Sequence, residues 1–139
     1  MTDKIFVDTN VLVYAHDLDA GEKYKTAAFL IENLWEERNG VISTLVLQEF
    51  YVTVTQKISS VFTPANARGI IENYMMWNVE ILTSASVLTA SIIAEKNQLS
   101  FWDAMIVTAA RNSGSKKILT EDMNNGQIID DVLIENPFK

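Results

Sequence analysis

The chain of 139 residues has no cysteine, one histidine, two prolines and five glycines. The absence of cysteine excludes a disulfide framework and thiolate metal sites, and a single histidine excludes a zinc site built from several imidazoles. The scarcity of proline and glycine predicts compact helices and strands joined by short loops. This length suits one domain of ordinary size, so we expect a single domain over residues 1–139.

Long apolar runs are also missing. The best candidate, residues 85–94, is interrupted by serine and threonine, whereas a membrane helix needs about 20 mostly apolar residues. The opening MTDKIF lacks the basic start and long apolar core of a signal peptide. We therefore expect a cytoplasmic protein that has no membrane partner.

Basic residues are outnumbered, with 11 Lys and Arg against 18 Asp and Glu and a formal net charge of −7. Nucleic-acid binding favours Lys and Arg, so this balance argues against such a partner. Two interpretations of the acidity stay open. It serves solubility, or it reflects carboxylates clustered to bind a cation.

Strand-like and helix-like segments alternate along the chain. The apolar run before Asp8 shows no polar alternation, which indicates a central parallel strand covered on both faces. Residues 44–58 are ambiguous, because their β-branched content favours a strand while their length favours a helix. We predict strands over residues 4–8, 41–43, 79–82, 117–120 and 132–134, and helices over residues 10–16, 22–38, 44–58, 64–76, 84–97 and 101–112.

The ends of the first two helices also have expected signals. Thr9 or Asn10 is a plausible cap of the first helix, and Asn39-Gly40 is expected to end the second. The alternation of strands and helices predicts one parallel sheet with helices packed on it. Ligands of such sheets bind beyond the carboxyl ends of the strands.

Four carboxylates occupy places that bear on this rule. Asp8 and Asp122 directly follow predicted strands, while Glu49 and Asp103 lie near the starts of helices. A parallel sheet can bring all four to one rim, where ionised carboxylates cannot crowd together without a cation. Oxygen ligands without cysteine or paired histidine select Mg²⁺ or Mn²⁺, and such a site suits phosphodiester hydrolysis.

Each acid also has a local explanation. Glu49 has apolar neighbours one helical turn away on both sides, so it either has a functional partner or reaches out to solvent or a base. Asp103 after Ser100 is typical of a helix cap, and Asp122 after Thr120 suggests the first turn of another short helix. A turn alone would account for Asp8.

Other candidates are weaker. The lone His16 is predicted to lie at the surface or at a helix end rather than to bind a ligand. Phe101 and Trp102 could stack on bases, but aromatic residues beside an apolar helix usually belong to the core, and we predict the core for both. The run from Tyr74 to Trp77 is predicted to serve packing or a protein interface.

Four segments now indicate a family: IFVDTNVLVYA, STLVLQEFY, LSFWDAMIVTAA and ILTEDMNNGQ. In this order and with these gaps they resemble PIN-domain proteins, and more narrowly the VapC-type toxins of toxin–antitoxin pairs. The resemblance covers nearly the whole chain. It implies a three-layer α/β/α sandwich with a central parallel sheet of four to five strands.

The resemblance further implies an Mg²⁺-dependent ribonuclease, in which Mn²⁺ can substitute. It implies an RNA substrate, a cognate antitoxin and a homodimer as partners. In the motif TEDM, Glu121 is an alternative to its neighbour as the last acid of the site. By residue match, the implied catalytic metal ligands are Asp8, Glu49, Asp103 and Asp122, and the residues that orient a carboxylate, water or phosphate are Asn10 and Thr120.

Two other functions remain open. The chain could be a PIN-domain nuclease of RNA processing without an antitoxin, which the absence of a small neighbouring reading frame would indicate. It could also be a non-catalytic protein-binding module, which would bind no Mn²⁺ specifically.

Overall fold

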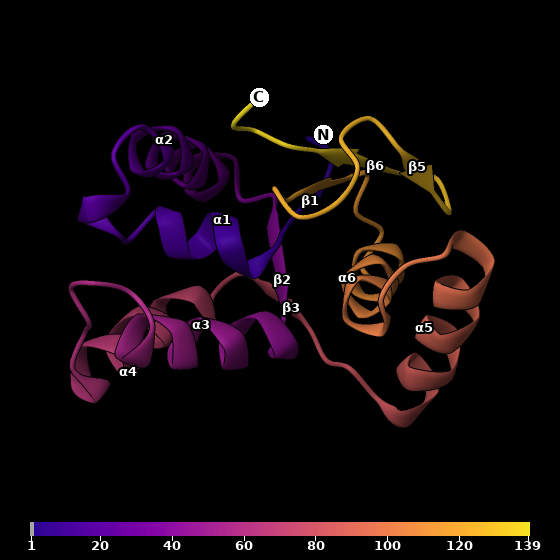
Figure 1. The fold of residues 1–139 in the computed structure, drawn as a ribbon, viewed down its shortest axis with the longest axis horizontal. Helices are drawn as coiled ribbons and strands as arrows, with labels where there is room; N and C mark the ends of the chain where they lie inside the picture. Colours follow the sequence, from indigo (N-terminus) through magenta and orange to yellow (C-terminus); the bar gives the residue numbers. More distant parts are fainter. Residues whose placement is uncertain (1) are drawn as a thin grey trace.

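The computed structural model describes residues 2–139, which form a six-stranded sheet between two layers of helices (Figure 1). The strand order is β3-β2-β1-β4-β6-β5, and all neighbours are parallel except β5 and β6. The strands are β1 (Ile5–Val7), β2 (Gly40–Ser43), β3 (Asn78–Glu80), β4 (Lys117–Leu119), β5 (Ile128–Ile129) and β6 (Val132–Glu135).

The helices lie in two groups. Figure 1 shows α1 to α4 on one side of the sheet and α5 and α6 on the other, which confirms the predicted α/β/α sandwich. The helices are α1 (Thr9–Tyr14), the 3₁₀ turn η1 (Leu18–Ala20), α2 (Glu22–Glu37), α3 (Thr44–Gln56), α4 (Pro64–Tyr74), α5 (Ser84–Asn97) and α6 (Phe101–Asn112).

Strand β1 lies at the centre of the parallel part of the sheet, as its apolar sequence predicts. Phe6 and Val7 are fully buried between the helical layers. The ambiguous segment after β2 is a helix, because Ser43 caps it by accepting a hydrogen bond from the Val46 N–H. Its start therefore lies directly at the carboxyl end of β2.

The residues predicted to cap α1 and to end α2 do not have these roles. The cap of α1 is Asp8, whose side chain accepts from the Thr9 N–H, so neither Thr9 nor Asn10 has that role. Helix α2 ends at Glu37, and the next residue, Arg38, has a left-handed backbone with φ of 56°. Gly40 instead belongs to β2, where a Cβ atom would lie 2.5 Å from the Trp77 ring. The glycine is thus required for close packing rather than for ending the helix.

The sheet has six strands rather than four to five, because the two-residue β5 forms a hairpin with β6. The turn between them contains Asp130 and Asp131, both with positive φ, at 49° and 66°. This is the backbone of a tight hairpin turn, for which Asn-Gly and Asp-Gly are the usual signals. A strand of two residues followed by two aspartates carries no such signal.

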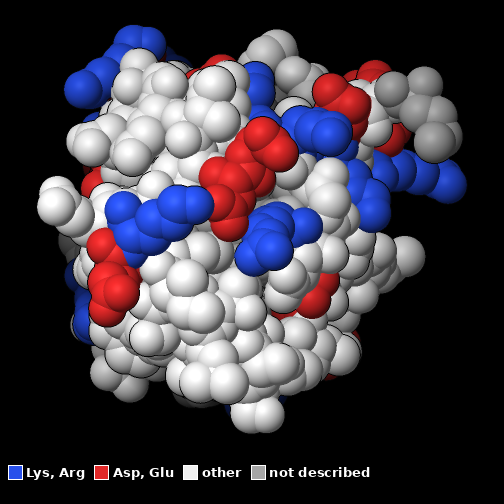
Figure 2. Space-filling view, turned by 90° about the vertical axis from the view of Figure 1, so that its right-hand side faces the viewer, with Lys and Arg blue, Asp and Glu red and all other residues white. Residues whose placement is uncertain are grey.

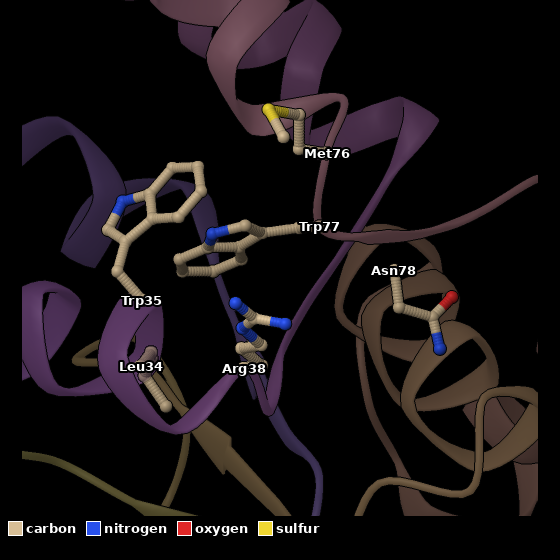
Figure 3. A pocket seen from close by; sticks show the side chains of 7 residues that line it. Leu34, Trp35, Arg38, Met76, Trp77 and Asn78 are labelled. Atoms are coloured by element: carbon tan, nitrogen blue, oxygen red, sulfur yellow. The ribbon is translucent and has the colours of Figure 1, made fainter.

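A cavity of about 440 Å³ lies at the amino ends of β2 and β3, away from the strand ends that carry Asp8 and Asp122. Figure 3 shows Trp35, Trp77 and Arg38 around it. The run from Tyr74 to Trp77 was predicted to serve packing or a protein interface. Tyr74 and Trp77 are buried in the core, whereas Met76 is 82% exposed.

Within residues 2–139 no helix has the length and apolar character needed to cross a membrane.

Candidate active site

Asp8 stands at the carboxyl end of β1 and is only 7% exposed. Its Oδ1 accepts from the Thr9 N–H at 2.7 Å and its Oδ2 accepts from the Thr120 hydroxyl at 2.8 Å. The pKa of Asp8 is raised to about 6, mainly by burial and to a smaller extent by the charges of Glu49 and Asp122, against the lowering effect of these hydrogen bonds. A buried carboxylate beside other carboxylates is a place where a cation is favourable.

Asn10 and Thr120 join this aspartate to Asp122. The Asn10 amide nitrogen lies 2.9 Å from Asp122 Oδ2 and 3.5 Å from Asp8 Oδ2. The Thr120 hydroxyl accepts from the Asp122 N–H at 3.2 Å while it donates to Asp8. Both polar residues therefore form hydrogen bonds with carboxylates of the candidate site.

Asp122 does not lie in a helix, so the predicted first-turn role is wrong. Residues 121–123 form bends after β4, and the only cap-like contact is the bond from the Asp122 N–H to Thr120. Thr120 is fully buried, and its hydroxyl also donates to Asp8. The position of Asp122 is thus fixed by the site rather than by a helix.

Glu49 lies on the exposed face of α3 near the rim. Its Oε1 accepts from the Thr9 hydroxyl at 2.8 Å. The apolar neighbours counted along the helix do not surround it, because Val46 packs into the core while Val52 faces solvent. Glu49 is therefore a rim carboxylate whose charge acts on Asp8.

Asp103 occupies the first turn of α6, as its position after Ser100 predicts. Its N–H donates to the side chain of Ser100, the cap of the helix, at 3.1 Å. Burial raises the pKa of its carboxyl group, the Ser100 bond lowers it, and the charge of Asp122 raises it. Asp103 is thus linked to the other acids through the charge of Asp122.

The four acids lie in the same region, but their side chains do not form a complete set of metal ligands. Among residues 2–139, no three His, Cys, Asp or Glu side chains lie close enough to hold a metal ion together. Two of the carboxylates, on Glu49 and Asp122, are instead bound by the donors Thr9 and Asn10. The donor chemistry still fits a hard divalent cation, because every candidate ligand is a carboxylate oxygen and Asp8 is buried.

A cavity of about 320 Å³ opens directly beside the acids. It runs between α1 and α3, and its walls combine the acidic rim with apolar surface. The lining residues are Thr9, Asn10, Val13, Tyr14, Asp17, Glu49, Thr53, Ile58 and Asp122.

Glu121 has a different environment from its neighbour. It accepts from the Tyr14 hydroxyl at 2.5 Å and from Lys23 Nζ at 2.8 Å. Burial alone would raise its pKa, but the bonds from Lys23 and Tyr14 outweigh this and lower it. Sequence reasoning missed Tyr14 and Lys23, because no local pattern connects them to a residue about a hundred positions away.

Of the weaker candidates, His16 contacts Tyr74 and Trp102 lies at the surface. His16 follows α1 at a helix end, as predicted, but its ring is largely buried against Tyr74, and burial lowers its pKa. Trp102 is 62% exposed, so its predicted place in the core is wrong. The buried face of α6 begins at Ala104, and Trp102 projects from the opposite side with the ring of Phe101 against it.

The fold is that of an α/β protein with a group of acidic residues at the carboxyl rim of a parallel sheet, where ligands of such folds bind. The sequence profile of the PIN domain matches residues 5–127. The chain belongs to the PIN domain family. A search of curated proteins found no match to it.

Solved structures share the fold at low sequence identity. VapC20 of Mycobacterium tuberculosis, a toxin that cleaves the sarcin-ricin loop, has 20% identity and a TM-score of 0.64 over 86% of this chain and 90% of that one. A toxin–antitoxin complex from Klebsiella pneumoniae has 16% identity and a TM-score of 0.70 over 96% and 98%. DNA-bound VapBC from Salmonella typhimurium has 16% identity and a TM-score of 0.66 over 98% and 99%.

Proposed function

We propose that this protein is a metal-dependent endoribonuclease and the toxin of a toxin–antitoxin pair, and that it acts in the cytoplasm. Residues 1–139 are proposed to form one nuclease domain. The observation that carries the proposal is the buried Asp8, which is surrounded by further carboxylates at the strand ends of a PIN-family sheet. The VapC fold of the solved neighbours supports it.

We propose Mg²⁺ as the cofactor, with Mn²⁺ as a substitute. The residues that would hold it are Asp8, Glu49, Asp103 and Asp122, whose oxygens suit either ion. When bound, such an ion activates a water molecule and stabilises the charge on the attacking and leaving oxygens of the phosphodiester.

The protein's own residues orient these carboxylates and receive the substrate. Thr120 fixes the plane of the Asp8 carboxylate through its hydroxyl, and the Asn10 amide holds Asp122 beside it. The cavity between α1 and α3 opens beside Glu49 and Asp122 and would give single-stranded RNA an approach to these acids.

Protein partners follow from the same family argument. We propose a cognate antitoxin that brings a basic side chain to the acidic rim, which is consistent with the net charge of −7. We also propose a homodimer. Figure 2 shows that much of the face formed by α5 is uncharged, and Val87, Leu88 and Ile92 are exposed on this helix.

The test is cleavage of single-stranded RNA by the purified protein with Mg²⁺, with Mn²⁺ and with a chelator. We expect cleavage only with the ions, and a loss of at least 100-fold in rate for Asp8→Asn and Glu49→Gln, because each removes an anionic ligand. The exposed Asp3→Asn is the matched control, since it removes the same charge outside the site. Cleavage by Asp8→Asn at the wild-type rate would exclude the proposed mechanism.

A further inference from the structure

Four residues from three distant parts of the chain meet beside the acidic rim. Lys23 Nζ lies 2.8 Å from Glu121 Oε2, 5.1 Å from the centre of the Tyr14 ring and 5.7 Å from that of Phe138. The Tyr14 ring meets the Phe138 ring edge-on at 5.3 Å, and its hydroxyl donates to Glu121. Both oxygens of the Glu121 carboxylate are therefore occupied by donors from α1 and α2.

The backbone of the same glutamate belongs to the site. Its N–H donates to Asn10 Oδ1 at 3.3 Å, and the amide nitrogen of that asparagine lies 2.9 Å from Asp122 Oδ2. The Glu121 backbone thus directly precedes Asp122, one of the acids of the candidate site. A glutamate side chain is long enough to turn from this point either to Lys23 or towards the other carboxylates.

We propose that Lys23 and Tyr14 are positioning residues that hold the Glu121 carboxylate away from the acidic site, so that Asp122 alone of this pair faces the metal. The inference rests on the proposed function, because it concerns the ligand set of the proposed metal site. It assigns a role to a lysine and a tyrosine that carry no site signal in the sequence.

A direct role of Lys23 in binding the RNA phosphate fits the geometry less well. Its ammonium group is already paired with Glu121, and aromatic rings lie on two of its sides. The Lys23 side chain keeps 46% of its exposure and that of Glu121 only 20%, so the pair is more enclosed at the carboxylate than at the cation. The Glu121 carboxylate is therefore the more restricted partner, because Lys23 and Tyr14 fix its position.

The experiment measures Mn²⁺ binding by calorimetry, without RNA, for the wild type, Lys23→Met, Glu121→Gln and the double variant. In Lys23→Met the Glu121 carboxylate loses its cation and becomes available as an additional ligand. We expect Mn²⁺ to bind about tenfold more tightly, because each added carboxylate raises the affinity of such a site. In the Glu121→Gln background the lysine substitution is expected to change nothing.

This cycle separates positioning from a simple field effect. The repulsion between a lysine and a bound cation would change the Kd by the same factor with or without Glu121, whereas positioning requires Glu121. Lys25→Met is the matched control on the same helix, because it removes a lysine that pairs with the exposed Glu22. We expect wild-type binding for this control.

Two further variants keep the test decisive if Lys23→Met is poorly folded. Lys23→Arg retains a cation and donors for Glu121 and is expected to bind Mn²⁺ like the wild type. Tyr14→Phe removes only one donor and is expected to tighten binding less than Lys23→Met does. Cleavage assays should show a lower kcat with unchanged KM for Lys23→Met, because an added ligand disturbs the metal rather than the RNA contacts.

The outcomes for the two proposals can be told apart. If the wild type binds no Mn²⁺ and cleaves no RNA, the proposed function is wrong. If the wild type binds Mn²⁺ but Lys23→Met has the same Kd, or shows the same change with and without Glu121, only the positioning role is overturned.

Discussion

Asp8 serves the fold and the site at once. It caps α1 through the Thr9 N–H, and it is buried at the end of the central strand. Burial without a cation is unfavourable for its charged form, which raises its pKa from 3.8 to about 6. This shift means that the fold is less stable, by a free energy on the order of 3 kcal/mol, when Asp8 is ionised than when it is protonated.

In the absence of metal, the stability of the protein should therefore depend on Asp8. Because the pKa is higher in the folded state, protonation favours folding below about pH 4, and this contribution is lost as the pH rises through 6. Asp8→Asn has no charge to bury. We expect it to be more stable than the wild type by about 2–3 kcal/mol at pH 8 and nearly equal at pH 4, in urea unfolding with a chelator.

Asp3→Asn is the control for this experiment, because it makes the same chemical change on an exposed residue before β1. It should leave the pH dependence of unfolding as in the wild type. If Asp8→Asn is less stable than the wild type at pH 8, the hydrogen bonds to the ionised carboxylate outweigh its burial.

The sequence predicted several contacts at this scale and missed others. Asp8, Asn10 and Thr120 follow strands, and the topology of a parallel sheet brings them within hydrogen-bonding distance of one another. The contacts of Lys23 and Tyr14 with Glu121 depend on side-chain conformations across three segments. No periodicity or spacing encodes such contacts.

Among the elements, the helices were predicted more closely than the strands. Helix α5 and helix α6 have the predicted bounds, because Thr83 and Ser100 supply cap signals at their starts. Strand β5 was missed, since two residues carry no pattern. The residues that end α2 were misidentified, because Arg38 rather than a glycine adopts the left-handed conformation.

The hairpin turn offers a test of this local physics. Asp131 has φ of 66°, a conformation that glycine adopts without the steric cost borne by a residue with a Cβ atom. We expect Asp131→Gly to stabilise the protein by roughly 0.5–1 kcal/mol in urea unfolding. Asp131→Ala removes the same carboxylate but keeps the Cβ atom, and it should give no gain. An equal gain from both substitutions would indicate that the carboxylate, not the backbone, is the source of strain.

At the scale of the whole molecule, the net charge of −7 and the acidic rim have a common consequence. A protein that concentrates carboxylates at one edge of its sheet is destabilised there until a cation binds. The charges of Glu49 and Asp122 add to the cost of ionising the buried Asp8. Divalent ions should therefore stabilise the fold itself, in addition to any part in catalysis.

A ligand that binds only the folded state stabilises it by about 2.7 kcal/mol at a concentration of 100 times its Kd. For a chain of this length, we expect the Tm at pH 7.5 to rise by about 8 °C in saturating Mn²⁺. Asp8→Asn should have a higher Tm than the wild type without metal but lose most of the rise with it, because a ligand is gone. Potassium chloride at equal ionic strength is the control for general screening. A Tm that rises equally in the salt and in Mn²⁺, or equally in the wild type and Asp8→Asn, would show that no ion is held at this rim.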